Sequence, residues 1–475
     1  MSDSKISITF YGGVEEVTGA NFVLEIKNNN QSHKIAIDCG LSQGSEFSSG
    51  KNREPFPYNP AEIETLLITH AHIDHIGRVP KFVRDGFKGR IISTPETRSL
   101  AEYMLADAER LMDEESRRNG VLPIYDKKDV EASMMLWQGI PYGESFEAIP
   151  GVNALARDAG HVLGSAMYEL SVFNKKIVFT GDLGNSPSPL LRDTEVVNDA
   201  DYLVMESVYG DRNHESKEES LVMLKEAILR TIKKGGTLLI PVFSLEKTQV
   251  LLYEMNYLVE NNQIPEVPVF LDSPLAIKLT QIYKGSFNLF NEKARAVIKS
   301  GDDIFHFPKL RFTESRMESE VIKNTRSPKI IIAGSGMSTG GRIIRHERAY
   351  LSDSRNTILF IGYQAAGSLG RQIQEGVKNV SIDGQNVHVK AEIMAITGYS
   401  SHKDMDGLVE FVQKATESLE LNPDASGRGA DRKRRLKVFV VMGEPKASMF
   451  LAQRLHDYLG VEAVHPEEGE TVELG

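Results

Sequence analysis

The chain has 475 residues, of which 41% are hydrophobic and 25% charged, and its formal net charge is −11. This composition is that of an ordinary globular protein and excludes disorder on a large scale, while the length predicts two or three domains. Nucleic-acid affinity usually comes with a basic face, so the net charge gives no support to a nucleic-acid substrate. Evidence for such a substrate must come from the residues of a functional site.

The sequence predicts neither export from the cell nor insertion into a membrane. Its start, MSDSKISITF, has no basic stretch leading into an apolar one, and no apolar run approaches the roughly 20 residues that span a bilayer. The single cysteine, Cys39, excludes an intrachain disulfide and fits a reducing compartment. We therefore predict a cytoplasmic protein without membrane contact, in which Cys39 is a small buried side chain.

The first 208 residues alternate short apolar segments with loops. The segments predicted to be strands are ISITFYGG (6–13), HKIAIDCG (33–40), TLLITHAH (65–72), GRIIST (89–94), AMYELSV (166–172), KKIVFTGD (175–182) and DYLVMES (201–207). A polar helix is predicted from Pro95 to about Arg118, with proline at its first position. Many strands with few helices between them predict sheet packed on sheet, flanked by helices.

The pattern changes after Glu206, where strands and helices alternate. Helices are predicted at 220–234, 246–260 and 341–351, and strands at TLLIPVF (237–243), VPVFLDS (267–273), KIIIAGSG (329–336) and NTILFIGYQ (356–364). Such βαβ alternation predicts a parallel sheet in a separate domain. The expected division is therefore 1–208 for the first part of one domain, 209–370 for an inserted domain, and 371–475 for the return to the first.

Residues 70–75, HAHIDH, directly follow a predicted buried strand and contain four potential metal ligands: His70, His72, Asp74 and His75. A lone histidine is usually a packed or solvated residue, but three histidines and an aspartate in six positions reverse that expectation. Imidazole and carboxylate donors bind borderline-soft divalent metals such as Zn²⁺, with His at about 2.0–2.1 Å. Loops at the C-terminal ends of strands are also a usual place for chemistry in α/β folds.

Three further residues could complete a site for two metal ions. A two-metal hydrolase holds its ions about 3.5–4 Å apart and needs a bridging carboxylate and outer ligands. His161 in DAGHVLGSAM, Asp182 in IVFTGDLG and His402 in ITGYSSHKD all stand beside glycines or at strand ends. Each alone is more often a cap or turn residue, and together with HAHIDH they point to a metal centre.

One glycine-rich segment, Gly334-Ser335-Gly336-Met337, follows a predicted strand. Its spacing, G-x-G-x-x-x-G, is one residue away from the dinucleotide-binding fingerprint, so we do not expect a nicotinamide cofactor. The strand–loop–helix pattern around these glycines agrees with a loop whose backbone N–H groups bind a phosphate.

These motifs resemble a known family. THAHIDHIGR, AGHVLGSA, FTGDLG and IAIDCG resemble the ordered signatures of the metallo-β-lactamase fold, and VMESVYGDR, LDSPLA, GSGMSTGGR, GYQAAGSLGR and GYSSHKD resemble those of its β-CASP branch. That branch contains RNase J and the nuclease that processes pre-mRNA 3′ ends. The resemblance covers about residues 6–470, and it implies an α/β protein in which an αββα sandwich is interrupted by an inserted parallel-sheet β-CASP domain.

The resemblance also implies a role for each candidate site residue. His70, His72 and His161 would hold one zinc ion, and Asp74, His75 and His402 would hold the other, with Asp182 bridging the two. Asp38 matches the family aspartate that orients the histidine loop, and Glu206 matches an acidic residue expected near His402. We therefore expect Asp38, Asp74 and Glu206 to serve catalysis. Histidine at position 402 favours RNA over DNA as the substrate.

One departure from the family pattern concerns the proton donor. The eukaryotic processing nuclease has a histidine where this chain has Gln372, and an amide cannot protonate a leaving alkoxide. His346 occupies a different position and is expected to be a surface histidine. Either water, or Glu206 acting with His402, would then have to supply the proton.

The function predicted on these grounds is zinc-dependent hydrolysis of single-stranded RNA, with two Zn²⁺ per chain and Mn²⁺ as an alternative. Metal-bridging hydroxide would attack the phosphorus in line and leave a 5′-phosphate, by endonucleolytic or 5′→3′ exonucleolytic cleavage. Ser335, Gly336, Ser368 and Arg371 are candidates for binding adjacent phosphates, although Arg371 could instead form a surface salt bridge.

Two other functions agree with the same motifs, and the sequence leaves the oligomeric state and the role of one basic segment undecided. A small-molecule hydrolase of this fold, cleaving a thioester or lactam, would need the same metals but no inserted domain over its site. A non-catalytic scaffold protein would have lost several ligands. A homodimer is neither predicted nor excluded. The basic segment SGRGADRKRRLK (426–437) is either a solvated loop or a contact for an RNA strand.

Overall fold

The computed structural model describes residues 5–28, 31–42, 50–365, 367–421 and 436–475. The chain forms two compact units: unit 1 consists of residues 1–186, 193–213 and 402–475, and unit 2 of residues 187–192 and 214–401. The predicted insertion began at 209 and ended at 370. Unit 2 extends to residue 401 because β19 (Glu392–Ala395) pairs in parallel with β16 (Thr357–Phe360), inside the sheet of that unit.

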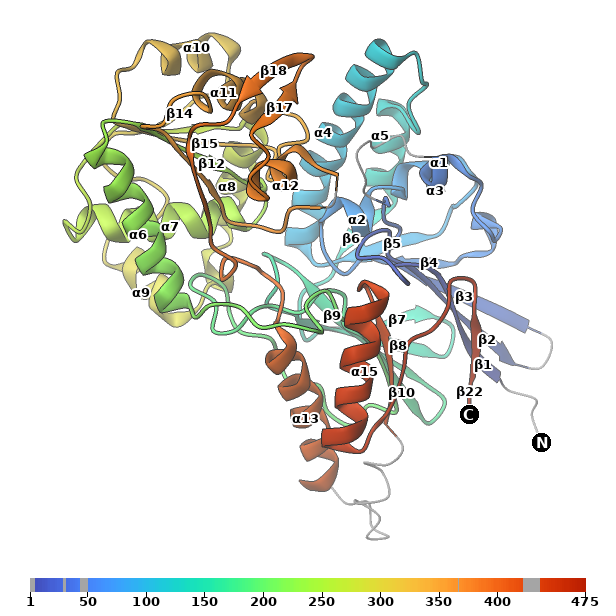
Figure 1. Ribbon diagram of the computed structural model, residues 1–475. Coiled ribbons are helices and arrows are strands. Elements are labelled where there is room, and N and C mark those ends of the chain that lie inside the picture. The colour runs from blue at the N-terminus through green and yellow to red at the C-terminus, as the bar shows by residue number, and fades with distance from the viewer. Residues whose placement is uncertain (1–4, 29–30, 43–49, 366, 422–435) are drawn as a thin grey trace. The chain divides into compact units, whose positions relative to one another are not determined.

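Unit 1 contains two seven-stranded sheets (Figure 1). The first runs in the spatial order β22 (Thr471–Leu474), β1 (Lys5–Gly12), β2 (Asn21–Asn28), β3 (Gln31–Ile37), β4 (Thr65–Leu67), β5 (Arg90–Ser93) and β6 (Trp137–Gly139). The second runs β21 (Glu462–Val464), β20 (Lys437–Val441), β11 (Tyr202–Glu206), β10 (Lys175–Phe179), β9 (Ala166–Val172), β8 (Val152–Asp158) and β7 (Ser145–Ile149).

Alternating apolar residues of the two sheets form one hydrophobic core between them. Strand β1 has the burial pattern of a half-covered strand, with every second residue buried, and it contributes Ile8 and Phe10. Phe179 and Phe439 reach the same core from the second sheet. Because side chains in a strand alternate between its faces, the opposite faces of both sheets are left for helices.

Helices cover the outer faces of the sandwich. Helices α4 (Pro95–Asn119) and α5 (Lys127–Leu136) pack beside β6 and β5, and α13 (Met405–Leu421) and α15 (Pro445–Leu459) share a core with the second sheet (Figure 1). Helix α4 begins where the sequence predicted, after the N-cap Thr94 and with proline in its first turn, and it ends at Gly120 in the left-handed conformation. The predicted αββα sandwich is confirmed.

Unit 2 is built on a six-stranded sheet in which all neighbours are parallel. Its spatial order is β14 (Leu310–Phe312), β13 (Val269–Asp272), β15 (Lys329–Ala333), β12 (Thr237–Pro241), β16 and β19. The helices are α6 (Lys217–Lys233), α7 (Lys247–Glu260), α8 (Pro274–Gly285), α9 (Glu292–Lys299), α10 (Arg316–Asn324), α11 (Ile343–Tyr350) and α12 (Leu369–Gln374). A hairpin of β17 (Asn379–Ile382) and β18 (Gln385–His388) follows α12. The predicted parallel sheet is confirmed.

His346 corrects one expectation about unit 2. It was predicted to be a surface histidine, but it is buried on α11 and its Nε2 lies 2.7 Å from Oδ2 of Asp272. Asp272 is fully buried at the end of β13, where Arg342, Ser319 and Thr313 also donate hydrogen bonds to it. Burial raises the pKa of this carboxyl, but the hydrogen bonds outweigh burial and lower it to about 2. His346 therefore helps to hold the carboxylate that joins β13 to α11.

Three other expectations concern single segments. Cys39 is fully buried, which confirms its role as a small core side chain, and burial raises the pKa of its thiol to about 12. No helix among the described residues is long and apolar enough to cross a membrane. Most of the basic segment 426–437 lies outside the described residues; Lys437 is described, and it lies in β20 with its Nζ 2.7 Å from Oε1 of Glu462.

Candidate metal centre

The candidate ligands of unit 1 lie in loops at the ends of its strands. The loop after β4 carries His70 and His72, and the single turn of α2 (Ile73–Ile76) carries Asp74 and His75. His161 lies between β8 and β9, Asp182 follows β10 by three residues, and His402 precedes α13. Strand ends therefore present most of these side chains at one edge of the sandwich, as the sequence predicted.

Four of these residues form the first group, with their ligand atoms within 4.8 Å of one another. Nδ1 of His72 lies 3.0 Å from Nε2 of His70 and 3.2 Å from Nε2 of His161. Oδ2 of Asp182 lies 3.4 Å from Nε2 of His70 and 3.5 Å from Nε2 of His161. Ligands about 2.0–2.1 Å from a tetrahedral zinc ion lie about 3.3 Å apart, and the four distances of 3.0–3.5 Å are close to that value.

The protonation of this group also suits a metal ion. Burial lowers the pKa of His70, His72 and His161, and the neighbouring histidines lower it further. All three imidazoles are therefore neutral at physiological pH, which is the form that binds metals. Burial raises the pKa of Asp182, but the surrounding histidines outweigh burial and keep it well below its ordinary value, so this carboxylate is ionised.

A second set of donors faces Asp182 from the other side. Nε2 of His75 lies 3.4 Å from Oδ1 of Asp182 and 3.9 Å from Oδ2 of Asp74. Both Nε2 of His75 and Oδ1 of Asp182 are buried and have no hydrogen-bond partner among the described residues. Buried polar atoms without partners are costly, and a cation between them would satisfy both. The two oxygens of Asp182 thus face two different groups of donors.

His402 and Glu206 lie on the Oδ2 side of Asp182. Oδ2 of Asp182 lies 3.8 Å from Nδ1 of His402, and Nδ1 of His402 lies 3.1 Å from both oxygens of Glu206. Glu206 is fully buried at the end of β11 and also accepts the amide N–H of Leu183 at 2.6 Å. Asp182, Glu206 and His402 form the second group whose ligand atoms lie within 4.8 Å of one another. The contact between Glu206 and His402 was expected from the sequence.

Asp38 forms hydrogen bonds with the loop that carries the histidines. Its Oδ2 accepts a hydrogen bond from Nδ1 of His75 at 2.7 Å, and its two oxygens accept the N–H and the hydroxyl of Thr69, each at 2.8 Å. Burial lowers the pKa of His75, but Asp182 and Asp38 outweigh burial and raise it well above its ordinary value. In the neutral imidazole that binds a metal, the bond to Nδ1 leaves the lone pair on Nε2, the atom that faces Asp182. Asp38 itself has no ligand atom in either group of donors.

Two residues near the site were not singled out in the sequence. Thr69 binds Asp38 and stands directly before His70, so its place in ITHAHIDH was a usable signal. Lys403 follows His402, is buried, and donates from Nζ to the carbonyl oxygen of Gly184 at 2.8 Å. Its amide also bonds to Leu183, so Lys403 ties the His402 loop to the Asp182 loop.

Close backbone packing requires glycine at two positions around these loops. A Cβ on Gly40 would lie 1.6 Å from the carbonyl oxygen of Asp74, and a Cβ on Gly181 would lie 2.6 Å from the Cβ of Thr69. Gly181 also has a φ of 53°, which other residues rarely adopt. The glycines in IAIDCG and FTGD therefore let the loops of Asp38 and Asp182 approach the histidine loop.

Asp38→Asn tests the orienting role. The amide can accept only through one oxygen, so either Thr69 or Nδ1 of His75 loses its acceptor, and we expect metal affinity to fall about 10- to 100-fold. Competition with a graded chelator, read as bound metal per chain, measures this effect. Thr471→Ala, which removes an exposed hydroxyl pair with Thr9 in the same unit, is the control and should bind metal like the parent. Unchanged metal affinity in Asp38→Asn would contradict the role.

The four candidate phosphate contacts all lie in unit 2. Ser335 accepts the amide of Thr339 with its hydroxyl oxygen, and Ser368 is the N-cap of α12. Arg371 pairs with Glu375 one turn later, Nε to Oε1 at 2.6 Å, which is the surface salt bridge that the sequence offered as the alternative. Gln372, at the position of the family histidine, is exposed.

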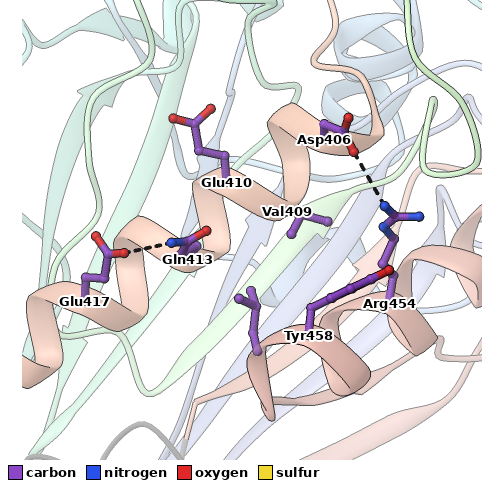
Figure 2. Close-up of a pocket in the computed structure, with 8 residues that line it drawn as sticks. Asp406, Val409, Glu410, Gln413, Glu417, Arg454 and Tyr458 are labelled. Atoms are coloured by element: carbon purple, nitrogen blue, oxygen red, sulfur yellow. Dashed lines mark hydrogen bonds and ion pairs between the residues drawn. The ribbon is translucent and has the colours of Figure 1, made fainter.

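A groove on unit 1 shares no residue with the metal centre. It lies between α13 and α15 and has a volume of about 530 Å³ (Figure 2). Its walls are Asp406, Val409, Glu410, Gln413 and Glu417 on α13, and Arg454, Tyr458 and Leu459 on α15. Three carboxylates and one guanidinium line it, with Arg454 3.8 Å from Asp406. It contains no donor set for a metal, so the candidate chemistry lies at the histidine cluster.

Comparison with known proteins agrees with this geometry. Residues 35–231 match the model of the metallo-beta-lactamase superfamily, and residues 248–373 match that of the Beta-Casp domain. A ribonuclease from Thermus thermophilus is 34% identical over 404 residues, which cover 85% of this chain and 90% of the relative. A transcription termination factor, FttA, from Methanosarcina mazei is 28% identical over 490 residues, 99% of this chain and 72% of the relative.

A solved structure shares the fold. The crystal structure of a protein of unknown function from Enterococcus faecalis matches with a TM-score of 0.55 over 99% of this chain and all of that chain, at 12% sequence identity. At that identity the match concerns the fold alone.

Proposed function

Because the chain belongs to the metallo-β-lactamase superfamily and carries its β-CASP domain, we propose that it is a metal-dependent ribonuclease that hydrolyses RNA phosphodiester bonds in RNA processing or decay. The observation that carries this proposal is the close approach of the ligand atoms of His70, His72, His161 and Asp182, all within 4.8 Å of one another. The ribonuclease relative supports RNA as the substrate, and the termination factor acts in a process that produces RNA.

The centre is proposed to hold two Zn²⁺ ions per chain, with Mn²⁺ as the alternative because carboxylates share the site. His70, His72 and His161 would hold one ion, Asp74, His75 and His402 the other, and Asp182 both. The two oxygens of Asp182 support the bridging role, since Oδ2 faces His70, His161 and, at 3.8 Å, His402, whereas Oδ1 faces His75. Oδ2 of Asp74 lies 3.9 Å from Nε2 of His75.

Bound at this centre, two divalent ions would lower the pKa of a water molecule to near 7 and neutralise negative charge on the phosphate. The residues of the chain would keep that chemistry in place. Buried, neutral imidazoles remain available as ligands, and Asp38 fixes the ring of His75. Glu206 is a fully buried carboxyl that holds Nδ1 of His402. It is proposed to hold or deliver the proton that the leaving oxygen requires, because Gln372 cannot.

Binding of adjacent phosphates is proposed for Ser335, Gly336, Ser368 and Arg371. Arg371 would have to exchange its contact with Glu375 for a phosphate, which a bidentate guanidinium–phosphate pair favours. The substrate is proposed to be unpaired RNA. The side chains of His70, His161 and Asp182 are at most 2% exposed, so a phosphate must reach below the protein surface to meet them. A single strand can bend into such a site more easily than a stacked duplex.

A small-molecule hydrolase of the same fold is the alternative, and the relatives do not favour it. A non-catalytic scaffold is disfavoured because all seven candidate ligands are present and gather in unit 1.

The proposed activity is tested with RNA labelled at its 5′ end. The metal-loaded chain is expected to cleave an unpaired strand into products with 5′-phosphate ends, to lose this activity to a chelator, and to regain it with Zn²⁺ or Mn²⁺. A blunt duplex of the same sequence should stay largely intact under the same conditions, as read on a sequencing gel. A chromogenic lactam and a thioester serve as rival substrates. Hydrolysis of either rival substrate, with RNA left intact, would show that the protein is a small-molecule hydrolase and not a ribonuclease.

A further inference from the structure

Unit 2 has a place where the topology of its sheet predicts ligand binding. In open parallel sheets, ligands bind outside the C-terminal ends of two adjacent strands whose following connections run in opposite directions. Strands β12 and β16 are such a pair: β12 continues to β13 on the β15 side of the sheet, whereas β16 continues to β19 at the opposite edge. The segments that follow these two strands are residues 242–247 and 361–365.

These two segments meet at an aromatic ring and an ammonium group. Nζ of Lys247 lies 4.6 Å from the centre of the Phe243 ring. A Cβ on Gly362 would lie 2.7 Å from Nζ of Lys247 and 3.2 Å from the Phe243 ring, and a Cβ on Gly336 would lie 2.4 Å from the same ring. The ring therefore packs against the backbone of both glycine-containing loops, and the ammonium group lies against Gly362.

The charge of Lys247 is not neutralised within the described residues. No carboxylate of that part of the chain lies within ion-pair distance of its Nζ, and the neighbouring Glu246 instead accepts a hydrogen bond from the hydroxyl of Tyr283 at 2.6 Å. Burial lowers the pKa of the Lys247 ammonium to about 8, and the positive charge of Lys217 acts in the same direction. The group is still mostly protonated at neutral pH, and a half-buried cation beside a second cation favours an anionic partner.

Two hydroxyl groups lie beside the adjoining strand ends, on the β13 and β15 side of β12. Oγ of Ser244, in the segment after β12, lies 3.4 Å from Oγ of Ser273 at the end of β13. A Cβ on Gly334, after β15, would lie 3.6 Å from Oγ of Ser273 and 3.8 Å from Oγ of Ser244. One cation, two hydroxyls, glycine backbone and an aromatic face are the groups that bind the phosphate and the base or sugar of a nucleotide.

We propose that the C-terminal ends of β12 and β16 carry a nucleotide-binding subsite of unit 2, in which Lys247 binds a phosphate of an RNA strand and Phe243 stacks on an adjacent base. The inference rests on the proposed function in taking RNA as the source of the phosphate. It adds a cation and an aromatic residue to the phosphate contacts proposed from the sequence, and it needs no metal ion. A free mononucleotide has the same chemistry, so the test separates the two sources.

The test measures binding by the metal-loaded full chain to a fluorescein-labelled unpaired RNA with phosphorothioate linkages, which resist hydrolysis. Lys247→Gln is expected to raise Kd about 5- to 10-fold and to reduce the slope of log Kd against log salt by about 0.7, the loss of one contact to a single strand. Phe243→Leu should raise Kd at least about 5-fold with an unchanged salt slope, because stacking carries no charge. Lys247→Arg should restore binding.

Lys323→Gln is the matched control. It removes an exposed ammonium group of unit 2 that pairs with Glu320, and it should bind RNA like the parent. AMP and inorganic phosphate are added as competitors. Displacement of RNA by AMP at micromolar concentration, lost only in Lys247→Gln, would support the site and assign it to a free mononucleotide. Parent values of Kd and salt slope in Lys247→Gln, with competition by AMP unchanged, would overturn the inference.

Failure of this site and failure of the proposed activity give different results. Cleavage of ordinary RNA is measured separately, so a parent chain that binds RNA through Lys247 but never cleaves it would contradict the ribonuclease proposal and leave the subsite standing. A parent that cleaves RNA while Lys247→Gln binds normally would do the reverse. Thermal melting of each variant checks that a loss of binding does not come from unfolding.

Discussion

Replacing Asp182 with alanine is expected to remove both metal ions and to lower RNA cleavage at least about 10³-fold. Its Oδ2 lies within 3.5 Å of Nε2 of His70 and His161, and its Oδ1 lies 3.4 Å from Nε2 of His75. A residue that faces both sets of donors affects both ions, whereas loss of a terminal ligand weakens mainly one. The variant also leaves three buried imidazoles without their carboxylate, which adds to the loss of metal affinity.

Elemental analysis after dialysis measures the effect as metal per chain. His402→Ala is the informative comparison, because its side chain is 20% exposed at the edge of the centre and should affect mainly one equivalent. Asp201→Ala is the control: this aspartate accepts the amide N–H of Lys176 in β10 and pairs with no histidine of the centre among the described residues. Two full equivalents of metal in Asp182→Ala would exclude the bridging role.

The residues of the centre could be predicted because their spacing is local. HAHIDH places four donors within six residues. The other three donors stand in short glycine-containing motifs at strand ends, and the fold of unit 1 brings these strand ends together. The structure brings together His70, His72, His161 and Asp182, although 112 residues separate the first from the last. What the motifs could not give was the distribution of contacts, such as the two oxygens of Asp182 facing different donors.

Other features depend on packing that leaves little trace in the local sequence. His346 was expected at the surface, yet the helix directs its side chain towards Asp272, a partner 74 positions earlier. Residues 371–401 were expected to return to the first domain, but pairing of β19 with β16 keeps them in unit 2. Lys247 stands in a segment, FSLEKTQV, in which we recognised no motif. Its place in a candidate binding site becomes visible only where two loops meet in the structure.

Glu206→Gln is expected to keep the metal ions and the melting temperature of the parent while lowering kcat about 10²- to 10⁴-fold, the usual contribution of a general acid or base. The amide has the shape of the carboxylate and can still accept the amide N–H of Leu183, which Glu206 binds at 2.6 Å. It cannot hold or deliver a proton beside His402, whose Nδ1 lies 3.1 Å from both oxygens of Glu206. Gln372 offers no substitute, because its amide cannot act as an acid.

The division between kcat and KM separates a chemical role of Glu206 from a structural one. An interaction used mainly in the transition state lowers kcat and leaves KM nearly unchanged, so the variant should bind RNA like the parent. Glu169→Gln is a matched control, since Glu169 is also a buried glutamate of the second sheet but pairs with Arg157 at 2.7 Å, outside the centre. We expect parent kcat in that control. A Glu206→Gln chain that retains its metal and cleaves RNA at the parent rate would mean that Glu206 only positions His402, and that water supplies the proton to the leaving oxygen.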